Sequence, residues 1–202
     1  MYSDDECKSF KESKMQLSLI NRNTKTGLQE PGCVSLGGNI VYSWARTDLG
    51  KQYEMISLDG GDTWTIPQVS IFYSPLSPLS MKRLPDGSLF AIWNPIPSYQ
   101  TKDIDIKTGG RTPLVYSLSI DDGNNWSEPI IIEKDEMSGY CYTAIEIYNN
   151  SLFLAYCSGN PKEHISCLNM TRIRKIPLEI IYKQKKNCSG YEAMGIGFVD
   201  ER

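Results

Sequence analysis

Apolar and polar residues alternate over short stretches of this chain, and Gly, Asn or Asp interrupts the pattern at frequent intervals. Apolar stretches such as YEMIS, TIPQVSIF, LVYSLS and SEPIIIE are each bounded by turn-forming residues. Short alternating runs between turns are typical of β-strands. Long helical periodicity is absent, and only residues 172–186 fit a helix as well as a strand. The pattern predicts an all-β protein.

One turn motif, S-x-D-x-G-x-x-W, occurs twice between such strands. Its residues are Ser57, Asp59, Gly61 and Trp64 in the first copy, and Ser119, Asp121, Gly123 and Trp126 in the second. A worn copy spans residues 3–10, with Cys in place of Gly and Phe in place of Trp. Because each motif residue has a role in a tight turn, the motif predicts architecture rather than catalysis. The Asp bonds turn amides, the Gly adopts an unusual φ, and the Trp folds back as an apolar plug.

A second repeat alternates with the first. The segments GNIVYSW (38–44), GSLFAIW (87–93) and NSLFLAY (150–156) each pair a turn with a strand and end in an aromatic residue. Together the two repeats give a module of four antiparallel strands, which is the pattern of a propeller blade. We expect residues 1–20 to be the outer half of a blade, residues 29–74 and 75–133 to be complete blades, and residues 139–185 to be a partial last blade.

The predicted blades are too few for a closed ring. The chain has 202 residues, which is room for about three blades, whereas propellers close with roughly four to eight. We therefore expect a partial propeller whose N-terminal half is missing from this sequence.

Composition narrows the function classes. With 21 basic and 24 acidic residues the net charge is −3, which argues against a nucleic acid partner. No apolar run is long enough to span a bilayer, and the polar N-terminus does not resemble a secretory signal, so the sequence assigns no compartment. A single histidine (His164) and the lack of a CxxC pair predict neither a metal site nor a cofactor, and make a Ser-His-Asp triad improbable.

Six cysteines are too few for a disulfide scaffold at this length, and we expect free, buried thiols more often than disulfides. Cys141 and Cys157 flank a predicted hairpin at Asn149–Asn150. A two-residue turn there would pair Tyr142 with Cys157 and Cys141 with Ser158, which gives no cross-strand cysteine pair.

The S-x-D-x-G-x-T-W turns resemble the Asp-boxes of the sialidase (neuraminidase) superfamily. The segments LQEPGCVSLGGNIVYSWARTDLGKQYEMISLDGGDTW, SPLSPLSMKRLPDGSLFAIWN, RTPLVYSLSIDDGNNWSEP and GYCYTAI extend the resemblance to the C-terminal half of bacterial exo-α-sialidase-like proteins, over about residues 1–175. The resemblance implies a six-bladed β-propeller and a glycosidase that removes sialic acid or a related acidic sugar from glycoconjugates. Asp-boxes also occur in non-enzymatic propellers, so the alternative is a non-catalytic module that binds carbohydrate or protein.

The resemblance also implies site residues. In that family three arginines hold the substrate carboxylate, and a tyrosine activated by a glutamate attacks the anomeric carbon. Glu30 resembles the activating glutamate, and Arg46 and Arg111 resemble two of the arginines. Tyr142 in YCYTAI resembles the nucleophile, with Tyr140 as the competing register. The third arginine and the acid/base aspartate have no match here, and we expect them in the missing half.

These residue types suit the substrate. A guanidinium binds a carboxylate through two parallel hydrogen bonds and stays charged. A carboxylate nucleophile would be repelled by the carboxylate on the reacting carbon of a sialoside, whereas a neutral tyrosine is not.

Overall fold

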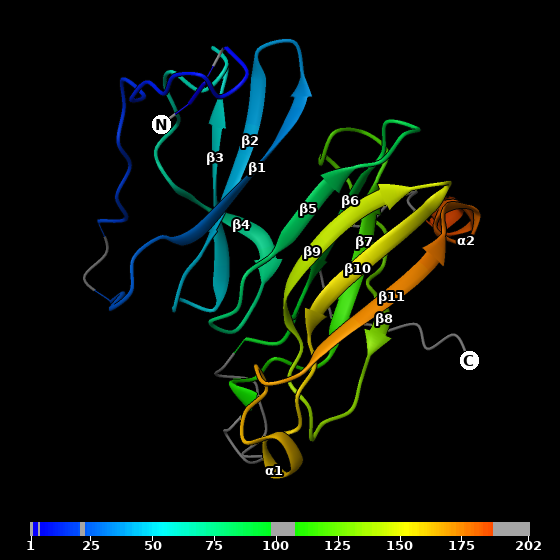
Figure 1. The fold of residues 1–202 in the computed structure, drawn as a ribbon. Coiled ribbons are helices and arrows are strands. Elements are labelled where there is room, and N and C mark those ends of the chain that lie inside the picture. The colour runs from blue at the N-terminus through cyan, green and yellow to red at the C-terminus, as the bar shows by residue number, and fades with distance from the viewer. Residues whose placement is uncertain (1, 4, 21–22, 98–107, 188–202) are drawn as a thin grey trace.

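The computed structural model describes residues 2–3, 5–20, 23–97 and 108–187, which form three antiparallel sheets (Figure 1). The first sheet contains β1 (Gln29–Gly37), β2 (Ile40–Arg46), β3 (Lys51–Ser57) and β4 (Gln68–Tyr73). The second contains β5 (Ser80–Arg83), β6 (Leu89–Trp93), β7 (Leu114–Ser119) and β8 (Ile130–Glu133). The third contains β9 (Cys141–Tyr148), β10 (Ser151–Cys157) and β11 (Thr171–Pro177). Neighbours in sequence are neighbours in each sheet, so the all-β prediction is confirmed.

The sheets pack side by side like the blades of an unclosed ring. Their first strands β1, β5 and β9 contact one another in that order, and therefore line the same side of the molecule. Short helices α1 (Pro161–His164), α2 (Leu178–Lys183) and the 3-10 helix η3 (Gln184–Asn187) accompany the third sheet. In the part of the chain that the structure describes, no helix has the length and apolar character needed to cross a membrane.

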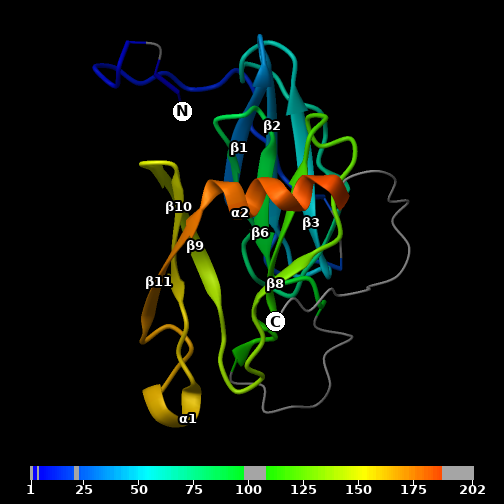
Figure 2. The ribbon, with the colours of Figure 1, turned by 90° about the vertical axis from the view of Figure 1, so that its right-hand side faces the viewer.

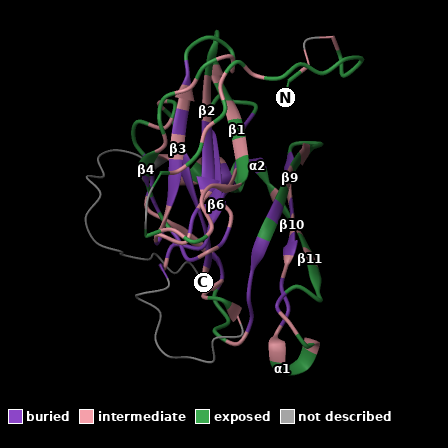
Figure 3. Ribbon diagram, turned by 90° about the vertical axis from the view of Figure 1, so that its left-hand side faces the viewer, coloured by how far each residue is buried: buried purple, intermediate pink, exposed green. Residues whose placement is uncertain are grey.

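Two hydrophobic clusters hold the sheets together (Figure 3). Between the first and second sheets, the Phe72 ring meets Trp93 and Trp126 edge-on, with centroids 5.0 and 5.1 Å apart. The second cluster joins the second sheet to the third and includes Leu178 and Ile181 of α2. Figure 2 shows α2 running from the end of β11 toward the second sheet. Residues 172–186, which fitted a helix or a strand, therefore contain both.

The repeated motif forms the same hydrogen-bonded turn in both full copies, which we call the S-x-D turn. After β3, Ser57 Oγ accepts from the Gly61 amide at 2.8 Å, and Asp59 Oδ1 accepts from the Thr63 amide at 2.9 Å. Gly61 has a φ of 103°, a conformation that glycine adopts without a steric penalty. The Trp64 indole donates back to the Gly61 carbonyl at 3.0 Å.

The copy after β7 repeats this pattern with matching partners. Ser119 Oγ accepts from the Gly123 amide at 2.8 Å, Asp121 Oδ1 accepts from the Asn125 amide at 2.8 Å, and Trp126 donates to the Gly123 carbonyl at 3.1 Å.

The worn copy near the N-terminus adopts this turn as well. Ser3 Oγ accepts from the Cys7 amide and Asp5 Oδ1 from the Ser9 amide, each at 2.9 Å. Cys7 takes the glycine position with a φ of 64°. The only bridge described in this segment pairs Tyr2 with Lys11. The N-terminal segment therefore forms the S-x-D turn between the bridged residues Tyr2 and Lys11.

The predicted register of the third sheet is wrong near the start of β9. From Ser151↔Tyr148 to Ala155↔Ala144 the pairing follows the expected two-residue turn, but Cys157 then pairs with Cys141. The shift arises because Tyr142 adopts a φ of 57° and forms a bulge. Five cysteines, Cys7, Cys33, Cys141, Cys157 and Cys167, are free thiols, and Cys188 lies outside the described residues. Cys141 and Cys167 are buried as expected, whereas Cys7 and Cys33 are exposed.

Candidate functional site

An open groove of about 520 Å³ runs along the three inner strands. Its lining includes the polar or charged residues Glu30, Ser80, Lys82, Tyr142 and Thr143, and apolar residues such as Trp44, Leu79 and Met81. Gly32 lies directly over the Trp44 indole, so that any side chain at this position would collide with the ring. The inner strands therefore present polar groups to a partly apolar, accessible surface.

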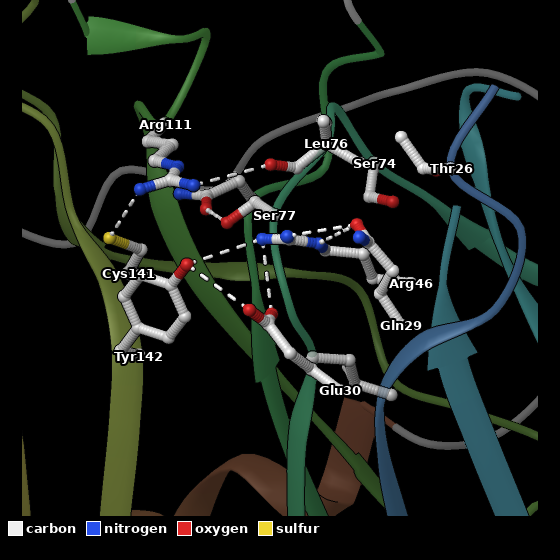
Figure 4. Close-up of polar contacts among 12 residues, drawn as sticks. Thr26, Gln29, Glu30, Arg46, Ser74, Leu76, Ser77, Arg111, Cys141 and Tyr142 are labelled. Atoms are coloured by element: carbon white, nitrogen blue, oxygen red, sulfur yellow. Dashed lines mark hydrogen bonds and ion pairs between the residues drawn. The ribbon is translucent and has the colours of Figure 1, made fainter. Parts of the chain in front are cut away.

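Glu30, Arg46 and Tyr142 meet at the mouth of this groove, although they come from three different strands (Figure 4). The Tyr142 hydroxyl donates to Glu30 Oε1 at 3.2 Å. Arg46 Nη1 donates to the Tyr142 hydroxyl oxygen at 3.3 Å and forms an ion pair with Glu30 Oε2 at 3.0 Å. The tyrosine oxygen is thus in contact with a carboxylate that can accept its proton and with a cation that stabilises a phenolate.

The backbone at Glu30 and Tyr142 is unusual. Glu30 has a φ of 49° and Tyr142 a φ of 57°, and both lie where the strand register shifts. A left-handed conformation costs a residue with a side chain about 1–2 kcal/mol relative to an ordinary strand. The two bulges turn the side chains of Glu30 and Tyr142 toward each other, and backbone strain of this kind is concentrated at functional sites.

Arg111, in the loop before β7, approaches Tyr142 from another side. Its guanidinium carbon lies 5.2 Å from the centre of the Tyr142 ring. Nη1 donates to Cys141 Sγ at 3.2 Å and Nη2 to the Leu76 carbonyl at 3.4 Å. Burial works against the charged form, but the neighbouring Cys141 and Tyr142 outweigh it and raise the pKa of Arg111. Arg111 therefore places a second guanidinium beside Tyr142, next to that of Arg46.

Tyr140 lies elsewhere. Its side chain is only 2% exposed and packs in the hydrophobic core with its ring edge toward Tyr156. Burial raises the pKa of the Tyr140 hydroxyl. Of the two candidate tyrosines, the structure brings Tyr142 to Glu30 and leaves Tyr140 in the core.

The sequence pattern did not single out Gln29 or Cys141. Gln29 Oε1 accepts from Arg46 Nε at 3.3 Å and Nη2 at 3.0 Å, and so fixes the plane of the guanidinium. Cys141 accepts from Arg111. The available signal was adjacency, since each residue immediately precedes a candidate catalytic residue.

The S-x-D turns lie at the other end of the sheets. Arg111 precedes β7 whereas Asp121 follows it, and Arg46 ends β2 whereas Ser57 ends the antiparallel β3. Their side chains are occupied by hydrogen bonds within each turn. The turns therefore shape the blades without contributing to the groove.

Comparison with known proteins identifies the fold and the family of this chain. The fold, with its inner strands meeting at one open groove, is that of a sialidase-type β-propeller, of which this chain forms part. The chain belongs to the BNR repeat-like domain family, whose sequence profile matches residues 1–154. No curated protein matches the chain in sequence.

Solved structures share the fold at low sequence identity. The NanB sialidase from Streptococcus pneumoniae is 19% identical, with a TM-score of 0.63, over 88% of this chain and 27% of that chain. The intramolecular trans-sialidase from Ruminococcus gnavus is 16% identical, with a TM-score of 0.52, over 74% of this chain and 32% of that one. An α-L-arabinofuranosidase from Fusarium graminearum is 14% identical, with a TM-score of 0.57, over 81% and 49%. The chain thus has a glycoside hydrolase-like fold and spans about a quarter to a half of these proteins.

Proposed function

We propose that the site is of the exo-α-sialidase type and acts on a terminal sialic acid or a related acidic sugar of a glycoconjugate. The observation that carries the proposal is the contact of the Tyr142 hydroxyl with Glu30 and Arg46 at the mouth of an open groove. Tyr142 is 42% exposed, so an incoming sugar can reach its oxygen.

In this proposal Arg46 and Arg111 bind the substrate carboxylate. Two guanidinium groups beside Tyr142 suit an anionic sugar better than a neutral one, because each is a cation that can donate a charge-assisted hydrogen bond to the carboxylate. Bound in this way, the substrate presents its anomeric carbon to the Tyr142 oxygen. An arabinofuranoside has no carboxylate and would leave both arginines without a ligand.

Glu30 then activates the nucleophile. Its carboxylate takes the phenolic proton as the Tyr142 oxygen attacks, and a covalent glycosyl-tyrosine forms while the leaving oxygen departs. Arg46 Nη1 stabilises the negative charge that develops on the phenolic oxygen. Glu30 returns the proton to Tyr142 when water displaces the sugar in the second step.

The leaving oxygen of a natural glycoside also needs a proton. No aspartate is recorded in contact with Tyr142 or Glu30 among the described residues, so the proposal assigns the role of acid to none of them. An aryl leaving group departs without such help. We therefore expect the chain alone to cleave a nitrophenyl α-sialoside far faster than sialyllactose.

The test compares release of nitrophenol from the α-sialoside and from the corresponding α-L-arabinofuranoside. We expect turnover of the sialoside only. Arg111→Lys should raise its KM about 10-fold or more, because a bidentate contact is lost, while the matched remote variant Arg174→Lys should leave KM unchanged. Binding of sialic acid without turnover of either glycoside would instead favour the non-catalytic module.

A further inference from the structure

Several thiols gather beside Arg111 at the edge of the groove. Cys141 is 1% exposed and Cys167 is 6% exposed, and Cys157 is half-buried. Cys157 and Cys167 lie close enough to Cys141 to influence its pKa. Within the described ranges, no group of three or more His, Cys, Asp or Glu side chains is placed to hold a metal ion.

Cys141 and Cys157 face each other directly across β9 and β10. Residues opposite each other in antiparallel strands have Cα atoms about 4.5–5.5 Å apart, which falls within the range of about 4.4–6.8 Å that a disulfide spans. Their side chains project from the same face of the sheet. The bulge at Tyr142 creates this pairing, since a regular register would place Tyr142 opposite Cys157.

We propose that Cys141 and Cys157 form a dithiol that closes into a cross-strand disulfide when the folded protein meets a small-molecule disulfide oxidant such as oxidised glutathione. Cys167 is the competing partner because it also lies near, against Gly139. The direct strand pairing favours Cys157, which is also the most accessible of the three thiols.

The reaction proceeds by two thiol–disulfide exchanges. The thiolate of half-buried Cys157 attacks one sulfur of the oxidant, whose S–S bond breaks and releases one thiol. The Cys141 thiol then gives up its proton to solvent and its sulfur attacks Cys157 Sγ, which expels the second thiol. Two protein thiols are oxidised, and one disulfide molecule is reduced to two thiols.

The environment of Cys141 slows the second exchange. Burial raises the pKa of its thiol to about 12, although the Arg111 guanidinium opposes this shift. Only the thiolate is a nucleophile, so closure of the disulfide should become faster as the pH rises.

Closure affects the site through Arg111. Cys141 Sγ accepts a hydrogen bond from Arg111 Nη1 in the free thiol state, and bonding to Cys157 turns this sulfur away. On the proposed function, the oxidised chain should therefore bind the sugar carboxylate differently and show a changed KM. The disulfide itself does not depend on that function.

Tryptic mapping tests the proposal without any substrate. No Lys or Arg lies between residues 135 and 161, so Cys141 and Cys157 share the peptide 135–162, while Cys167 lies in 163–172. The folded chain is incubated with oxidised glutathione, its remaining thiols are alkylated, and the peptides are weighed. We expect peptide 135–162 to be unalkylated and lighter by two hydrogen atoms in most molecules.

Controls separate the alternatives. Cys157→Ser should abolish the internal link, whereas Cys7→Ser should leave it intact. A peptide 135–162 that is joined to 163–172, or that keeps two alkylatable thiols, would overturn the proposal. If Cys157→Ser fails to fold, the mapping of the unmodified sequence decides alone. An internal link in a chain that hydrolyses no sialoside would support the dithiol and count against the proposed function.

Discussion

Two clusters in this molecule combine a tyrosine, a glutamate and arginine, yet they are arranged in opposite ways. In the groove, Tyr142 and Glu30 face outward, while the Arg46 side chain is only 11% exposed. In the second cluster, the Tyr156 hydroxyl donates to Glu133 Oε1 at 2.5 Å, and Arg172 and Arg174 pair with the same carboxylate at 2.7 and 3.0 Å. Here the tyrosine and glutamate are buried and the arginines are 41% exposed.

The backbone differs as well. Glu30 and Tyr142 are held in left-handed conformations at bulges, whereas Tyr156 and Glu133 lie in strands without positive φ. Burial, followed by the hydrogen bond to Glu133, raises the pKa of Tyr156, so its phenol stays protonated. The same three residue types thus leave the tyrosine hydroxyl accessible in one cluster and enclose it in the other.

The largest effect is expected on turnover, where substitution of Tyr142 and substitution of Tyr156 should differ most. Tyr142→Phe should reduce turnover of a nitrophenyl α-sialoside at least about 10³-fold, because the nucleophilic oxygen is removed. Tyr156→Phe should leave turnover within about 2-fold and instead lower the free energy of unfolding by about 1–2 kcal/mol through the lost hydrogen bond. Steady-state kinetics and denaturant titration measure both. Equal losses of turnover in the two variants would show that the Tyr142 hydroxyl is not the nucleophile.

The sequence predicts the parts of this arrangement that depend on local chemistry. The S-x-D turns follow from Ser, Asp and Gly at fixed spacing, and even the copy with Cys7 folds in the same way, because its Ser and Asp still bond the turn amides. The strands follow from alternation. The family resemblance supplied Glu30, Arg46, Arg111 and Tyr142.

Contacts between residues far apart in the chain could not be predicted from the sequence pattern. The bulge at Tyr142 has no local signal, since tyrosine rarely adopts positive φ, and it changed the partner of Cys157. The Glu133 cluster joins β8 to β11 through residues far apart in the chain. Whether a tyrosine lies in the core like Tyr140 or in the groove like Tyr142 depends on this same bulge.

Replacing the glutamate of each cluster should affect stability in the opposite order to activity: the free energy of unfolding should fall more at Glu133 than at Glu30. Glu133→Gln leaves Tyr156 and two arginines around a neutral amide and should cost about 2–3 kcal/mol. Glu30→Gln breaks a partly exposed ion pair and should change the free energy of unfolding by less than about 1 kcal/mol, while turnover falls sharply. Denaturant titration of the two variants is the measurement. A larger stability loss at Glu30 would contradict the comparison.

Gly should be more stabilising than Ala at Glu30, whereas Ala should be more stabilising than Gly at Tyr156. At Glu30, with a φ of 49°, Gly should give a fold about 1 kcal/mol more stable than Ala, since only Gly adopts this conformation without strain. At Tyr156, within β10, Ala should be the more stable by about 0.5–1 kcal/mol. Thermal unfolding of the four variants gives the two differences, and the same sign at both positions would rule out strain at Glu30.

A third tyrosine–glutamate pair, Tyr42 and Glu54, forms its hydrogen bond with no arginine in the pair. Substitution of Glu54 should have the smallest effect on stability. The Tyr42 hydroxyl donates to Glu54 Oε2 at 2.9 Å, and burial raises the pKa of Glu54 despite this hydrogen bond. The folded protein therefore binds the Glu54 proton more tightly than the unfolded chain, and stability falls as the pH rises from the ordinary glutamate pKa through the folded value.

Glu54→Gln cannot lose a proton and should be more stable than the unmodified chain at pH 7 by about 1 kcal/mol or less, with no gain at pH 4. Denaturant midpoints at the two pH values measure this difference. A destabilised variant at pH 7 would mean that the folded protein stabilises the ionised form of the Glu54 carboxylate, contrary to the effect of its burial.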